Sequence, residues 1–166
     1  MGFIDVIKER AKAANKTIVL PETEDRRTYE AAAQILKEGI AKIILVGSEE
    51  AVKKGSEGLD LTGAVVVDPA TSDRTRAYID KLVELRQKKG MTPEQAKEIL
   101  LNQYLYYGVM MVKMGDADGM VSGACHSTAD TLRPCLQILK TKPGTKLVSA
   151  FFLMVVPNCE YGADGT

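Results

Sequence analysis

TIVLPETEDRRTYEAAAQILKEGIAKIILVG, residues 17–47, decides the fold class of this chain. It opens with a short β-branched run at 17–22 and closes with a second apolar run at 42–47, and both have the character of buried strands. A helix is expected between them, capped by Thr23 or Asp25. Its apolar positions at helical spacing are Tyr29, Ala32, Ala33 and Leu36. Two buried strands joined through a helix predict a parallel βαβ unit.

The same alternation continues on both sides of this unit. Further helices are expected at residues 3–14, at 48–55, from Ser72 or Asp73 to Lys89, as one helix or a pair from Thr92 towards Met114, and at 128–140. Further strands are expected at residues 64–69, 119–124 and 147–156. The sequence therefore predicts an α/β fold: a three-layer, parallel-sheet domain with helices on both faces.

Composition limits the classes of function. The chain has 166 residues, 45% of them hydrophobic and 27% charged, which suits a globular domain with a sizeable core. The 22 basic and 22 acidic residues balance, so a broadly basic nucleic-acid binder is not expected. The longest apolar run, residues 147–157, is much shorter than the ~20 residues that a membrane helix requires. We expect neither nucleic acid nor membrane as a partner.

The cysteines and the first residues indicate a cytoplasmic protein. The three cysteines are widely separated, without the spacing of a metal site, which is typical of free thiols in a reducing compartment. Residues 1–16 mix charges among apolar positions and do not have the pattern of a secretory signal.

The last twenty residues suggest an incomplete unit. A strongly apolar strand is expected at 147–156, and the turn-rich run PNCEYGADGT follows at 157–166. Such a turn normally leads to a returning strand, and an unpaired apolar edge strand is a liability. We expect a fragment whose partner strand is missing or supplied by another chain, with a naturally frayed terminus as the alternative.

GACHSTADTLRPCLQILK, residues 123–140, is the candidate site. In open α/β sheets ligands bind beyond the carboxyl ends of strands, where loops enter helices. Glycine lets the backbone approach a ligand closely, and unpaired N–H groups at a helix start favour an anion. Ser127 and Thr128 add hydroxyl groups. The pattern predicts a cradle for a phosphoryl or acyl-phosphate group, although a helix cap without a ligand has the same pattern.

Three further side chains are candidates. Arg133 could bind a phosphate with two hydrogen bonds, or form a surface ion pair. His126 could donate to an oxyanion or transfer a proton, or have a purely structural role. Arg86 falls on the apolar stripe of its predicted helix, where a charge needs an acidic or anionic partner unless burial ends there.

VMMVKMGDADGMVSGACHSTADTLRPCLQILKT, residues 109–141, closely resembles the phosphate acetyltransferase (phosphotransacetylase) family. TIVLPETEDRRTYEAAA, KIILVG and VPNCEYGADG match the family pattern too, so the resemblance covers the whole chain. It implies a two-domain enzyme, related in fold to isocitrate and isopropylmalate dehydrogenases and usually dimeric. The implied reaction transfers acetyl between coenzyme A and inorganic phosphate by direct thiolate attack on acetyl phosphate.

The resemblance also implies roles for particular residues. Ser127, Thr128 and Arg133 match the catalytic loop that faces the acyl phosphate. Arg86, Arg133, His126 and Cys159 match positions that contact coenzyme A or line the cleft. Coenzyme A is a substrate, and neither a metal nor a prosthetic group is implied.

Family members are considerably longer than this chain, and their second half carries the aspartate proposed to deprotonate coenzyme A. We therefore expect residues 1–145 to form domain 1, residues 146–166 to open a truncated domain 2, and the fragment alone to be inactive. The alternatives are a phosphate butyryltransferase, a non-catalytic acetyl-CoA-binding regulatory module, and a purely structural domain.

Overall fold

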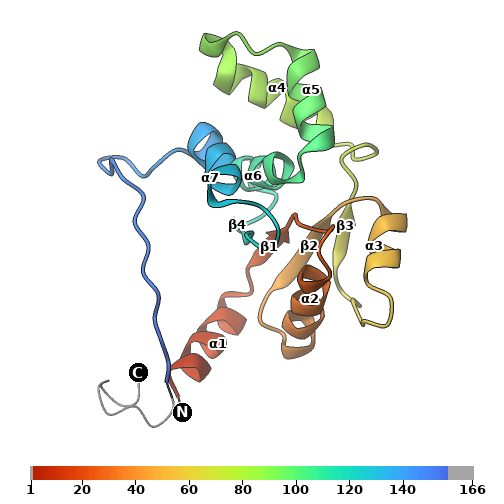
Figure 1. Cartoon of the computed structure of the whole chain (residues 1–166), viewed down its shortest axis with the longest axis vertical. Helices are drawn as coiled ribbons and strands as arrows, with labels where there is room; N and C mark the ends of the chain where they lie inside the picture. The colour runs from red at the N-terminus through yellow and green to blue at the C-terminus, as the bar shows by residue number, and fades with distance from the viewer. Residues whose placement is uncertain (1, 157–166) are drawn as a thin grey trace.

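The computed structural model describes residues 2–156, and a four-stranded parallel sheet lies at its centre (Figure 1). The strands, in the spatial order β3-β2-β1-β4, are β1 (Thr17–Leu20), β2 (Lys42–Val46), β3 (Val65–Val67) and β4 (Gly119–Met120). The helices are α1 (Phe3–Ala14), α2 (Arg26–Glu38), α3 (Glu49–Gly55), α4 (Thr75–Arg86), α5 (Pro93–Asn102), α6 (Tyr104–Met114) and α7 (Thr128–Pro134). A 3-10 turn at Gln87–Lys89 follows α4, and a π-helical turn at Cys135–Leu139 follows α7.

Each face of the sheet is covered by helices. The alternating side chains of β1 and β2 divide between two buried clusters because successive side chains of a strand point to opposite faces. Val19, Ile44 and Val46 pack with α4, α5 and α6 in one cluster, whereas Leu20, Ile43 and Leu45 pack with α2 and α3 in the other. This arrangement confirms the three-layer α/β fold.

Helix α6 lies very close to β1, and Gly108 makes this possible. A Cβ atom at this position would lie 2.8 Å from the Met120 sulfur and 3.2 Å from Cγ1 of Val19. A larger side chain would push the helix away from the strand, since cores are packed without spare volume. The close approach brings the first turn of α6 beside the carboxyl ends of β1 and β4.

The strand order creates a switch point between β1 and β4. The chain runs from β1 to β2 to β3 on one side and then returns to place β4 on the other side of β1. The loops that leave β1 and β4 therefore diverge, and in parallel sheets such a point is where ligands bind. The predicted site at 123–140 follows β4 and so lies at this point.

Most predicted elements are present, with shorter strands. Asp25, not Thr23, caps α2, accepting a hydrogen bond from the N–H of Arg27. The region after Thr92 is a pair of helices, α5 and α6. The strand expected at 119–124 is confined to Gly119–Met120, because the residues that follow turn towards Glu22.

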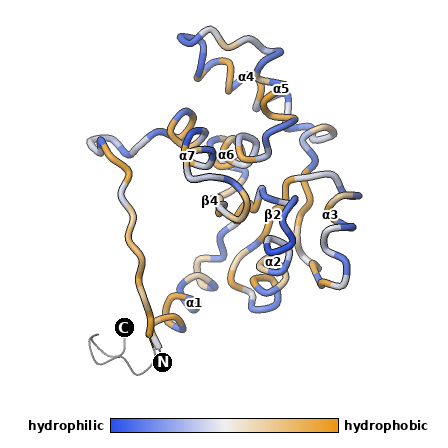
Figure 2. Tube along the Cα trace, viewed as in Figure 1, coloured by the Kyte–Doolittle hydropathy of each residue, from blue (hydrophilic) through white to orange (hydrophobic). Residues whose placement is uncertain are grey.

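The strand predicted at 147–156 is wrong for the described residues. This segment makes no ladder with the sheet and runs as an extended, apolar trace away from the domain (Figure 2). Phe151 is 90% exposed and Phe152 is 95% exposed. An apolar pattern predicts a strand only where another strand is available to pair with it. The assignment of residues 146–166 to a second domain stays a prediction.

Pro134 explains the irregular end of α7. Its missing N–H cannot donate to the preceding turn, which interrupts the helix expected at 128–140. The helix accommodates it by widening into the π-helical turn, where the N–H of Lys140 donates to the carbonyl of Cys135 at 3.0 Å. Among the described residues, no helix has the length and apolar character needed to cross a membrane.

Candidate active site

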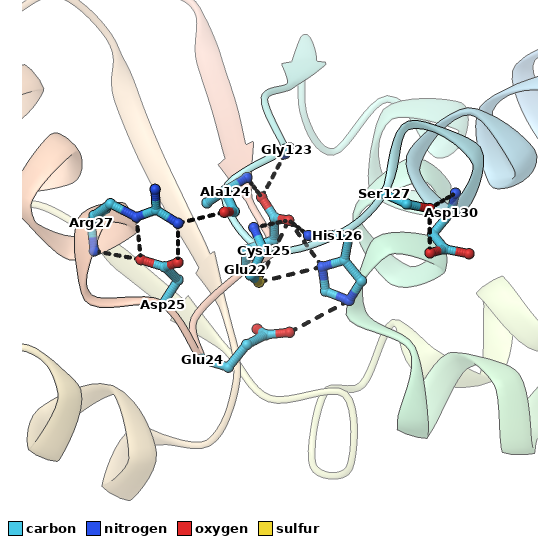
Figure 3. Close-up of polar contacts among 10 residues, drawn as sticks. All are labelled: Glu22, Glu24, Asp25, Arg27, Gly123, Ala124, Cys125, His126, Ser127 and Asp130. Carbon is cyan, nitrogen blue, oxygen red and sulfur yellow. Dashed lines mark hydrogen bonds and ion pairs between the residues drawn. The ribbon is translucent and has the colours of Figure 1, made fainter.

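Glu22 stands at the centre of the site (Figure 3). It follows β1 and is 2% exposed. Its carboxylate accepts hydrogen bonds from the backbone N–H groups of Gly123 and Ala124, both at 2.7 Å, Cys125 at 3.1 Å and His126 at 3.0 Å. Nδ1 of His126 lies 2.9 Å from the same carboxylate. Glu22 thereby joins the carboxyl end of β1 to the loop that leaves β4.

These contacts keep Glu22 ionised. Burial by itself would raise the pKa of the Glu22 carboxyl group, because it disfavours the charge. The hydrogen bonds from Ala124, Cys125, His126 and Gly123 outweigh burial and hold that pKa far below its ordinary value. At neutral pH the loop therefore surrounds a buried, fully bonded anion.

The predicted anion cradle exists, but part of it is already filled. The sequence indicated that the N–H groups around Gly123 and Ala124 would hold a ligand, and the structure gives them to Glu22. Gly123 adopts φ +119, a conformation that favours glycine, and this turns the N–H groups of the loop inward. The N–H groups of Gly123 and Ala124 are therefore not available to an external anion.

Ser127 caps α7, and both hydrogen bonds of its hydroxyl group are made with Asp130. Its Oγ accepts from the N–H of Asp130 at 3.2 Å and donates to the Asp130 carboxylate at 2.6 Å. The hydrogen bond from Ser127 lowers the pKa of Asp130. Ser127 is therefore a side-chain N-cap, and the Asp130 carboxylate bonds to its hydroxyl, not to the backbone N–H that a capping box would use. Among the described residues no partner is recorded for the N–H groups of Thr128 and Ala129, which remain available at the helix start.

A cleft of about 410 Å³ opens beside this helix start. Clefts of this size are typical of small-molecule sites. Arg133 and His126 both line it, opposite the segment that joins α5 to α6. The full lining is Thr23, Glu24, Ala51, Asn102, Gln103, Tyr104, Leu105, Tyr106, His126, Asp130 and Arg133. Arg133 is 59% exposed and 3.7 Å from the Asp130 carboxylate, so this loose ion pair leaves its guanidinium accessible.

Arg86 lies near the same region without lining the cleft. Its Nε is buried and has no hydrogen-bond partner among the described residues, so the acidic or anionic partner that the sequence predicts for this charge is not supplied by them. Tyr106, which lines the cleft, is influenced by the charges of both Arg86 and Arg133. Burial raises the pKa of Tyr106, and the positive charges of Arg133 and Arg86 oppose that rise. The charges of both predicted arginines therefore act on one tyrosine of the cleft.

Glu22, Cys125 and His126 also form the described group most similar to a metal site, with donor atoms within 4.8 Å of one another. The chemistry of the donors does not fit a bound cation. The carboxylate oxygens already accept the hydrogen bonds of the loop. Burial, with the charges of Glu24 and Glu22, raises the pKa of the Cys125 thiol to about 11, whereas metals bind the thiolate.

The structure brings His126 and Arg133 together at the cleft and places Ser127 and Thr128 at its edge, on the helix start. Arg86 is close by, and Cys159 lies outside the described residues. Sequence reasoning missed Glu22. Its position directly after a buried strand was the available signal, since side chains at carboxyl ends of parallel strands meet at the site edge.

The parallel fold with its switch-point cleft is that of a ligand-binding α/β domain, and comparison with known proteins gives the family. The family described as Phosphate acetyl/butaryl transferase matches residues 2–164. The chain belongs to this family.

Individual relatives are named phosphate acetyltransferases. The protein of that name from Acetivibrio thermocellus is 57% identical over the whole chain, and the one from Thermoanaerobacterium thermosaccharolyticum is 50% identical over 99% of it. The structure of EutD phosphotransacetylase from Staphylococcus aureus has a TM-score of 0.79 at 42% identity, covering 87% of this chain and 44% of that one. A phosphotransacetylase from Streptococcus pyogenes has a TM-score of 0.81 at 39% identity, covering 89% and 46%. The chain spans about half the length, 50%, of the two curated relatives.

Proposed function

We propose that this chain is the first half of a phosphate acetyltransferase, which transfers acetyl reversibly between coenzyme A and inorganic phosphate. Membership of the family and the names of the relatives support the reaction class. The single observation that carries the proposal is the cleft at the β1–β4 switch point, with the accessible guanidinium of Arg133, loosely paired with Asp130, beside a helix start. Both features favour a phosphoryl group.

The chemistry follows from this arrangement. The coenzyme A thiolate attacks the carbonyl carbon of acetyl phosphate, so that a C–S bond forms and the bond from carbon to the phosphate oxygen breaks. Phosphate leaves with the electron pair of that bond. Arg133 and Arg86 stabilise the negative charge that develops, while the Thr128 hydroxyl, with the Ser127 cap beside it, lies at the acyl-phosphate end. No prosthetic group is needed, because coenzyme A and phosphate are themselves the substrates.

Binding of coenzyme A tests the proposal on this chain. Isothermal titration calorimetry should detect coenzyme A, and Arg133→Ala should weaken its affinity at least tenfold, because the cleft loses its accessible cation. Arg76→Ala is the matched control: Arg76 is an exposed helical arginine paired with Asp80, away from the cleft, and its loss should leave the affinity unchanged. No binding by the unaltered chain, or equal losses in the two variants, would contradict the proposal.

The transfer reaction itself belongs to the longer protein. In a protein as long as the curated relatives, the substitution Arg133→Ala should lower turnover by about 10²–10³-fold. The alternative acyl preference, butyryl, is favoured by one observation, the description of the family, which covers both. Rates with acetyl phosphate and butyryl phosphate distinguish the two.

The proposal includes a cytoplasmic location, to which the free thiols of Cys125 and Cys135 are suited, and a homodimer in the longer protein.

A further inference from the structure

The Glu22 carboxylate decides which nitrogen of His126 carries hydrogen. At 2.9 Å, Nδ1 of His126 and Oε1 of Glu22 are within hydrogen-bonding distance. An ionised carboxylate only accepts hydrogen bonds, so the hydrogen of this contact must be on Nδ1. A neutral imidazole has a single N–H, and its Nε2 is then bare.

The surroundings of the ring support this orientation. His126 is tied to Glu22 twice, through its backbone N–H and through Nδ1, so the ring cannot turn without breaking a contact to a buried charge. Arg27 holds the same loop from the other side by donating to the carbonyl of Ala124 (Figure 3). The side chain of His126 is 34% exposed, whereas that of Glu22 is 3% exposed, so the ring extends from a buried anchor towards the cleft that it lines.

We propose that Glu22 is a positioning residue that fixes His126 in the Nδ1–H tautomer and presents its bare Nε2 to the cleft as a hydrogen-bond acceptor. The acceptor suits a substrate group that carries hydrogen on sulfur or oxygen, such as a thiol or a phosphate hydroxyl. The ligand class rests on the proposed function, but the tautomer does not. Glu22 itself touches no substrate, because its oxygens are enclosed by the loop.

Glu24 is the other acidic group near the ring. Its Oε1 lies 3.6 Å from Nε2, beyond hydrogen-bond length, and its side chain is 52% exposed. It is therefore free to move aside for a substrate. Glu24 also provides a control for Glu22, because it carries the same carboxylate group beside Nε2, the other nitrogen of the His126 ring.

The single histidine of the chain makes the tautomer directly measurable. Long-range ¹H–¹⁵N spectra of the chain, labelled at histidine and recorded with the ring neutral, report the two nitrogens separately. We expect an excess of the Nδ1–H form at least tenfold above that of the same residue in the urea-denatured chain, which corresponds to about 1.4 kcal/mol. A predominant Nε2–H form in the folded chain would overturn the proposal.

Two variants separate Glu22 from a general effect of charge. Glu22→Gln should lower the Nδ1–H excess at least threefold, because a neutral amide oxygen accepts more weakly than a carboxylate. Glu24→Gln should leave the Nδ1–H form predominant. An unchanged ratio in a folded Glu22→Gln chain, or an equal fall in Glu24→Gln, would refute the role of Glu22. The measurement on the unaltered chain decides the tautomer even where Glu22→Gln does not fold, and it needs no substrate, so failure of the proposed function is detected separately.

Discussion

The loop sequence predicts a bound anion, and the carboxylate of Glu22 occupies that position. The loop 123–126 supplies the N–H groups and the glycine of an anion-binding site, and a carboxylate 101 residues away along the chain from Gly123 fills it. Local sequence cannot reveal such a contact, because the pairing of two strand ends depends on the order of strands in the sheet. The nature of the loop as an anion binder was predictable, whereas the identity of its anion was not.

Because of the buried Glu22 carboxylate, the free energy of unfolding depends on pH. The pKa of Glu22 is lowered from its ordinary value of 4.5, so its stabilising contribution is present above that value and is lost as the pH falls below it. We expect Glu22→Gln to lower the free energy of unfolding by about 2–3 kcal/mol at neutral pH, since it leaves buried N–H groups poorly paired. In urea titrations the difference between the two chains should shrink steadily below that ordinary value.

Glu24→Gln is the matched control for this prediction. Glu24 is half-exposed, and its substitution should change stability by no more than about 0.5 kcal/mol. A Glu22→Gln difference that stays constant from neutral to acidic pH would show that the carboxylate charge contributes nothing to folding.

At the scale of elements, helix α7 shows how a capping pattern and a binding pattern overlap. Ser127 is committed to Asp130 as a cap, whereas Thr128 is exposed and makes no recorded side-chain hydrogen bond. The sequence predicted both hydroxyls as site residues. The structure separates them, since one stabilises the helix start and the other is available to a ligand.

Substitution of the two hydroxyls tests this separation. Ser127→Ala should lower the free energy of unfolding by about 1 kcal/mol through loss of the cap. Thr128→Ala should change it by no more than about 0.5 kcal/mol. Thermal or urea unfolding of the two variants measures both effects. Equal effects on stability would mean that Ser127 does not cap α7.

The remaining elements show which patterns carry information. Helices with a clear cap and stop, such as α2 between Asp25 and Gly39, were predictable because these signals are local. The strand β4 was predicted too long, because its last residues leave the ladder to bind Glu22. The prediction of a strand at 147–156 was wrong because a strand requires a partner strand, and an apolar sequence alone does not provide one.

On the scale of the whole molecule, residues 147–156 form a long exposed apolar segment. Leu147, Phe151 and Phe152 are at least 80% exposed, and every residue of the segment lies away from the two cores. Long exposed apolar stretches promote association. The N-terminal helix α1 has no buried residue either.

We expect this segment to make the chain self-associate. Replacement of both Phe151 and Phe152 by Ser should reduce concentration-dependent light scattering severalfold and leave the unfolding temperature unchanged, because neither ring packs in a core. Phe3→Ser, on the half-exposed face of α1, is the control and should have a smaller effect. Scattering that is unaltered by the double substitution would contradict the expectation.

The central claim is that a phosphoryl group binds in the cleft of Arg133 and His126, while Glu22 keeps the N–H groups of Gly123 and Ala124. Titration of the ¹⁵N-labelled chain with inorganic phosphate tests it most directly. We expect saturable shifts at the N–H groups of Thr128 and Ala129 and at the Arg133 and His126 side chains, with small changes at Gly123 and Ala124. Absence of saturable shifts in the cleft, or the largest shifts at Gly123 and Ala124, would contradict it.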